Sequence, residues 1–331
     1  MFERFRGKER KIVAGIKFTA IVDEYIKSVI SLAKRTDMSL KFTHVVEQWT
    51  SASVIYPGEY ISSGIAKAAE EQRTKEATNE LQKTLKPYLS KGEFETSVHV
   101  GRPGEALKSD ALISRASLIV CGVKPVSYRF VPRGFSTAIE LMTESSIPVL
   151  VIPEGKFYDF NGEKFTVLVC DDLSQTSADV LSTAGELSGA FRNVTLHHLH
   201  IHKESKEQLL TWANQVFEMM ITRDLEYDFE IDKHSIVSNT EKAIHKKMDK
   251  RLEIPQSFLN LNNVSYTQEV RFGDVFDELT QSIKSLNPDL IVFGRHHFLH
   301  KHPVSIGKVP FYAMLNLNIP IMIVSNIGHL K

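Results

Sequence analysis

Two stretches of the chain, VHVGRPGEALKSDALISRASLIVCG (98–122) and VRFGDVFDELTQSIKSLNPDLIVFG (270–294), align without a gap. Gly122 falls on Gly294 at an offset of 172 residues, and the match continues in the same register toward the end of the chain. Each stretch reads as an apolar run, a glycine turn, an amphipathic helix and a second apolar run, which is typical of βαβ units. A repeat of this kind predicts two copies of one α/β domain.

The front halves of the copies match as well. KIVAGIK (11–17) lies over TVLVCDD at an offset of 155, and LKFTHVV (40–46) lies over LHHLHIH at an offset of 156. The offset then grows from 156 to 172, which places 16 additional residues between the second and third strands of the second copy. We expect this insertion within the charged segment 203–260, as two helices.

Apolar runs alternate with amphipathic helices throughout, so we expect a doubly wound parallel sheet of five strands in each copy, in the order 3-2-1-4-5. The copies occupy 1–153 and 165–331, and EGKFYDFNGEK (154–164) joins them. The last strands, 149–152 and 321–324, are apolar edges. Antiparallel pairing between them would protect both edges and make the chain a pseudo-dimer. Homodimerisation of whole chains stays open.

Composition narrows the classes of function. The 331 residues carry 40 Lys plus Arg and 40 Asp plus Glu, a balance that argues against a nucleic-acid partner. No apolar run approaches the ~20 residues of a membrane helix, and the charged start of the chain does not resemble a signal peptide, so we expect a cytoplasmic protein without a membrane partner. Cys121 and Cys170 lie in apolar runs and are expected to be buried, reduced thiols.

Tandem α/β units that end in a glycine loop, a helix and a final PVLVI strand resemble the universal stress protein family, over essentially the whole chain. The resemblance implies the nucleotide-binding, adenine alpha-hydrolase-like fold. In that family the fourth strand runs into G-x-x-G, nine residues and then G-(S/T), whose N–H groups hold the phosphates of ATP, while an Asp that ends the first strand meets the adenine. Glycines and a helix N-terminus suit phosphate, and the ligand would lie where the strand order reverses.

The first copy departs from this pattern. Gly122 keeps the first glycine position, but Pro125 and Phe135 replace the next two, and Gly134 stands one position early. Lys17 stands where the adenine-facing Asp is expected, and an ammonium group cannot accept a hydrogen bond from the adenine amino group. We therefore predict a degenerate nucleotide site in this copy.

The second copy keeps more of the pattern. Asp172 ends its first strand, Gly294 and Gly307 stand 13 residues apart as required, and His297 and Lys308 replace the middle glycine and the final Ser or Thr. We expect ATP or another adenine nucleotide here, with adenine on Asp172 and with phosphate on the glycine N–H groups and on Arg295 or Lys308. The candidate nucleotide-binding residues are Asp172, Ile201, Gly294, Arg295, His297, Gly307 and Lys308. Asp171 would exchange roles with Asp172 if the strand register were shifted by one, and the alternative is a decayed loop whose glycines only make turns.

Histidines form a second pattern in this copy. His198, His200 and His202 share one face of a strand, and the loop RHHFLHKH (295–302) follows the fourth strand. A metal site is one interpretation, but His44 stands at the matching place in the first copy, so we expect no required metal. The loop would also suit a pH-sensitive anion patch.

No nucleophile elbow, P-loop or Cys-x-x-Cys motif occurs in the sequence. We therefore expect a stress-response protein that binds an adenine nucleotide without turning it over, not an enzyme. The alternative is a nucleotide-free interaction scaffold that recruits an unknown protein partner through segment 203–260. An adenylate-forming enzyme is disfavoured, because the S-G-G-x-D-S type loop is missing after the first strand.

Overall fold

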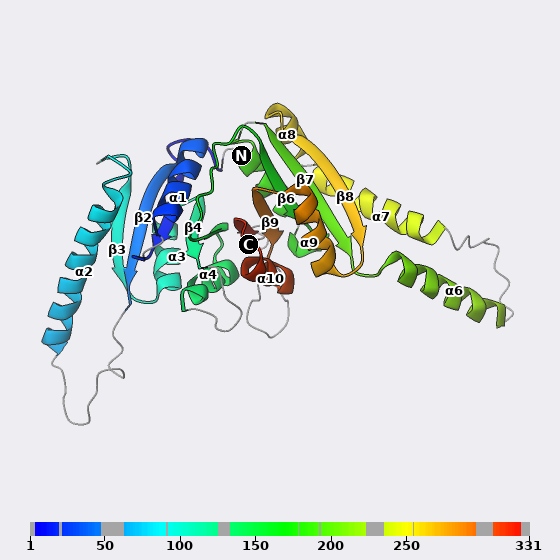
Figure 1. Cartoon of the computed structure of the whole chain (residues 1–331), viewed down its shortest axis with the longest axis horizontal. Helices are drawn as coiled ribbons and strands as arrows, with labels where there is room; N and C mark the ends of the chain where they lie inside the picture. Colours follow the sequence, from blue (N-terminus) through cyan, green and yellow to red (C-terminus); the bar gives the residue numbers. More distant parts are fainter. Residues whose placement is uncertain are drawn as a thin grey trace, which may run out of the picture. The chain divides into compact units, whose positions relative to one another are not determined.

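The computed structural model describes residues 4–19, 22–47, 63–90, 92–124, 133–177, 179–191, 193–222, 235–253, 255–295 and 307–325. The chain forms two compact units, which are residues 1–163 with 295–331 (unit 1) and residues 164–294 (unit 2). Each unit is a layered α/β structure (Figure 1). In the described part of the chain, no helix has the length and apolar character needed to cross a membrane.

Unit 1 is built on a parallel sheet in the order β3-β2-β1-β4-β5, which confirms the predicted order 3-2-1-4-5. Its strands are β1 (Lys11–Ile16), β2 (Ser39–Val46), β3 (Glu95–Val100), β4 (Leu118–Val123) and β5 (Val149–Pro153). Its helices are α1 (Val22–Thr36), α2 (Ser63–Leu85), α3 (Pro103–Ile113), α4 (Arg133–Glu144) and α10 (Lys308–Asn316). The sheet forms the core, and α1 buries an apolar stripe with helical spacing that includes Val22, Ile26 and Val29.

Unit 2 repeats the first four strands in the parallel order β8-β7-β6-β9, which corresponds to 3-2-1-4. These strands are β6 (Phe165–Cys170), β7 (Val194–His202), β8 (Ser265–Phe272) and β9 (Leu290–Gly294). The helical segments are the short turn η2 (Gln175–Ser177), α5 (Val180–Ser188), α6 (Lys206–Thr222), α7 (Ser235–Leu252), α8 (Gln256–Leu261) and α9 (Val275–Leu286). Between β7 and β8 the predicted helices are therefore α6 and α7, and the short α8 follows them.

Backbone conformation repeats at the positions that the sequence matches. Single residues with positive φ end helices or connect elements at equivalent places in both copies, as expected for a left-handed turn residue. The matched pairs are Asp37 and Asn193 (φ 54° and 52°), Gly101 and Gly273 (142° and 137°), and Arg115 and Asn287 (51° and 44°). The repeat is thus one of three-dimensional structure as well as of sequence.

The last strands of the two copies pair as predicted. β10 (Ile321–Val324) runs antiparallel to β5, with Met322 opposite Leu150. This pairing lies within unit 1, so the compact units divide the chain differently from the boundaries of the sequence repeat. The antiparallel pairing removes one exposed sheet edge, and the pseudo-dimer stays a prediction.

Candidate functional site

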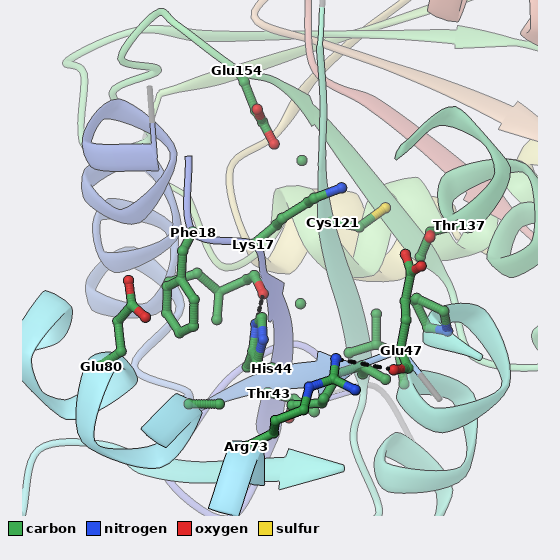
Figure 2. Close-up of a pocket in the computed structure, with 18 of the residues that line it drawn as sticks. Lys17, Phe18, Thr43, His44, Glu47, Arg73, Glu80, Cys121, Thr137 and Glu154 are labelled. Carbon is green, nitrogen blue, oxygen red and sulfur yellow. Dashed lines mark hydrogen bonds between the residues drawn. The ribbon is translucent and has the colours of Figure 1, made fainter. Parts of the chain in front are cut away.

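A cavity of about 620 Å³ opens at the carboxyl ends of β1, β2 and β4 in unit 1 (Figure 2). This is the place where the strand order reverses between β1 and β4, a position where open α/β sheets bind ligands. Its walls come from the ends of the strands, from α2 and from the segment after β5. The residues that line it include Lys17, Phe18, His44, Arg73, Lys124 and Glu154.

An aromatic pair forms one wall of this cavity. The rings of Phe18 and His44 stack with their centroids 4.3 Å apart. His44 Nδ1 lies 2.9 Å from the carbonyl oxygen of Ile16, and burial lowers the pKa of His44. A neutral ring whose Nδ1–H donates to that carbonyl fits both observations. On the same side Arg73 Nη2 donates to the main-chain oxygen of Glu47 at 3.3 Å.

The wall beside β4 holds a carboxylate. A Cβ atom placed on Gly122 would lie 2.6 Å from Glu154 Oε1, so the Glu154 side chain occupies the space that the glycine leaves. The Glu154 N–H donates to the carbonyl of Val123 at 2.7 Å, which anchors this residue just after β5. Burial raises the pKa of Glu154, and Lys124 and Lys17 oppose this rise. Nearby, burial raises the pKa of the Cys121 thiol to about 12, so the thiol stays protonated at neutral pH.

In unit 2, a chain of hydrogen-bonded polar side chains runs from the end of β6 into β7 and β8. The Asp171 carboxylate lies 2.6 Å from Ser177 Oγ and 3.3 Å from His198 Nε2, and His198 Nδ1 lies 2.9 Å from the Tyr266 hydroxyl. Burial acts to raise the pKa of Asp171, but hydrogen bonds from His198 and Ser177 outweigh it and lower the pKa. Arg251 Nε is 3.7 Å from the same carboxylate.

The first copy is apolar at the matched positions. The residues Asp171, His198 and Tyr266 correspond to Ile16, Phe42 and Phe94. Phe42 and Phe94 contact each other with centroids 6.4 Å apart, and His198 and Tyr266 do so at 6.2 Å. The second copy has therefore replaced an apolar cluster with a hydrogen-bonded one in the same framework.

Two predicted residues, Asp172 and Gly294, lie at the ends of the neighbouring strands β6 and β9. Asp172 is exposed, and its Oδ1 accepts from the Ser174 N–H at 3.0 Å and lies 2.6 Å from Ser177 Oγ. A Cβ on Gly294 would lie 2.9 Å from Ser177 Cβ, so the glycine admits η2 at close range. Ile201 is half-buried in β7.

Other predicted residues lie elsewhere. Arg295, in unit 1, is buried, and its Nη1 donates to the carbonyls of Thr143 and Ser145 at 2.8 and 2.9 Å. The guanidinium therefore supports the end of α4, which argues against the phosphate contact predicted for Arg295. Gly307 has φ 86° and precedes α10, and Lys308 is exposed. His297, Pro125 and the side chain of Phe135 lie outside the described residues.

The three histidines that share one face of β7 have partners of their own. His198 belongs to the buried chain, His200 Nδ1 lies 2.9 Å from the Asp171 carbonyl, and His202 Nε2 lies 3.1 Å from Glu204. The His200 contact repeats that of His44, at the end of the first strand of its copy. Within the described ranges, no group of three or more His, Cys, Asp or Glu residues is arranged to hold a metal.

Replacing one residue of the buried hydrogen-bonded group should lower the free energy of unfolding more than replacing Asp171, His198 and Tyr266 together. Asp171→Ile removes the carboxylate partner of the buried His198 Nε2, and we expect the free energy of unfolding to fall by about 3–5 kcal/mol at neutral pH. The triple variant Asp171→Ile, His198→Phe, Tyr266→Phe restores the residues of the first copy and should recover most of that loss. Urea unfolding at pH 7 measures both, and a triple variant as unstable as the single one would contradict the interpretation. Because the Asp171 pKa is lowered in the fold, its contribution is full above the ordinary Asp pKa of about 4 and declines as the pH falls below it.

Comparison with known proteins finds the same architecture in other proteins. The model of the universal stress protein family matches residues 9–153 and 165–325. A solved universal stress protein from Archaeoglobus fulgidus DSM 4304 is 11% identical, covers 95% of this chain and 98% of its own, and superposes with a TM-score of 0.57. A functionally unknown protein from Pseudomonas aeruginosa PAO1 is 13% identical, with coverage of 95% and 92% and a TM-score of 0.50.

At these identities the solved structures establish the fold alone. A search of curated proteins finds no significant match to the chain. The family model, in contrast, covers nearly all of both copies. The chain therefore belongs to the universal stress protein family, as two domains of that family in tandem.

Proposed function

We propose that this chain is a stress-response protein that binds small ligands without converting them, and that its two copies bind unlike ligands. The observation that carries this proposal is the contrast between Lys17 and Asp172, which follow the first strand of each copy at matched positions with opposite charge. An ammonium group only donates hydrogen bonds and a carboxylate only accepts them. The two strand-end sites therefore favour ligands with different donor and acceptor patterns.

An adenine nucleotide is the proposed ligand of the second copy. The exposed Asp172 carboxylate at the end of β6 suits the adenine amino group, which donates. A phosphate placed beside Gly294 on this side would require η2 to move, because Ser177 lies against that glycine. Binding without turnover is proposed because the sequence carries no nucleophile motif.

Isothermal titration with ATP tests this proposal with a matched pair of variants. Asp172→Asn keeps the size of the side chain but replaces one accepting carboxylate oxygen with a donating amide group. We therefore expect the affinity for ATP to fall about tenfold. Lys17→Gln, at the matched position of the first copy, should leave ATP affinity unchanged. Equal losses in both variants, or no heat with millimolar ATP, would contradict the proposal, as would ADP accumulating at a catalytic rate.

Exposed apolar side chains on α6 support a second candidate function, that of an interaction scaffold. Trp212 and Met219 are 57% and 49% exposed on α6, and seven residues of separation place them on one side of the helix. Figure 1 shows α6 and α7 extending away from the sheet of unit 2. Exposed large apolar side chains that share a helix face are typical of partner-docking helices.

Site-specific photo-crosslinking in cells tests the scaffold. A benzophenone amino acid at position 212 should yield a discrete adduct of one partner protein. The same group in place of Ile113, which is 78% exposed on α3, should not. Identical adduct patterns from the two positions would remove the scaffold function.

A further inference from the structure

In the cavity of unit 1, a carboxylate occupies the space beside Gly122, near the end of β4. Glu154 Oε1 fills the space beside Gly122, and the main-chain bond from Glu154 to Val123 holds the segment there. A phosphate that approached Gly122 on this side would therefore meet a carboxylate. A ligand whose charge has the same sign as a charged group in its binding site binds more weakly, because the two charges repel each other.

The same carboxylate lacks a hydrogen-bond donor. Glu154 Oε2 is buried and accepts no hydrogen bond from any residue in the described ranges. Within those ranges no Lys or Arg nitrogen lies within 4.0 Å of the carboxylate, although Lys17 and Lys124 line the cavity. Figure 2 shows Glu154 and Lys17 reaching the same part of the cavity. Buried polar atoms are almost always hydrogen-bonded, so this oxygen indicates a ligand that brings an N–H group.

The remaining walls favour a flat, partly apolar ligand. The stacked rings of Phe18 and His44 form one side, and Val46 and Leu107 add aliphatic surface. Aromatic rings pack against other flat rings with a favourable contribution beyond buried area. Lys17 offers a donor to a ring nitrogen or carbonyl oxygen. A volume of about 620 Å³ lies within the usual range for small-molecule sites.

We propose that this cavity binds a phosphate-free nitrogen heterocycle of nucleoside size, whose N–H group donates to Glu154. The inference rests on the proposed function, since it names the ligand class of the first copy. It also separates the two copies chemically, because the side chain nearest to Gly294 in the second copy is that of Ser177 and not a glutamate.

Titration of the full chain with adenosine, guanosine and their 5′-monophosphates tests the inference. The chain should carry Asp172→Asn, so that the second copy contributes little. We expect at least one nucleoside to bind about tenfold more tightly than its monophosphate, because the phosphate meets Glu154. Glu154→Gln removes the charge and keeps the shape, and it should bring the two affinities within about threefold of each other. Glu105→Gln removes the same charge from an exposed position on α3 and should leave the ratio unchanged.

Melting curves first establish that both glutamate variants fold. A monophosphate that binds as tightly as its nucleoside before Glu154 is changed would overturn the inference, and the cavity would remain a ligand site as proposed. A ratio that does not change in Glu154→Gln would also overturn it. If no probe binds at millimolar concentration, the proposed function of the first copy fails together with the inference.

Discussion

We propose that the space beside one glycine decides which ligand each copy of this chain binds. The fourth strand of each copy runs toward a glycine, and in both copies a side chain of the protein occupies the space next to it. Glu154 lies against Gly122 in the first copy, and Ser177 lies against Gly294 in the second. A carboxylate at this place repels an anionic ligand, whereas the neighbour in the second copy is an uncharged hydroxyl that bonds to the carboxylates of Asp171 and Asp172. The difference between the copies follows from this substitution more than from the glycines themselves.

Around that glycine the two copies keep one framework and change its chemistry. Ile16 and Phe42 in the first copy become Asp171 and His198 in the second, at matched positions of the two sheets. Because these positions are apolar in the first copy, the polar side chains at its strand ends are those that line the cavity. In the second copy the polar groups are satisfied internally, by Ser177 and Tyr266. A satisfied buried network of this kind fixes the geometry of the strand ends and makes them costly to alter one residue at a time.

The fold was predictable from the sequence because the repeat fixed the register of its elements. Gly101 and Gly273 illustrate this, since both stand at a sharp turn and both adopt a positive φ. The pairing of β5 with β10 was predictable because both are apolar edges. The site was less predictable, because the decisive side chains lie outside the glycine motif. Glu154 follows the fifth strand and is far in sequence from Gly122, and Arg295 contacts α4, more than a hundred residues earlier in the chain.

The central claim is that the two copies bind unlike ligands at once. Native mass spectrometry of the full chain, with ATP and the preferred nucleoside present together, tests it most directly. The account predicts a species that carries one ATP and one nucleoside, and excess ATP should not displace the nucleoside. A chain that takes up two ATP molecules, with the nucleoside displaced, would contradict the account.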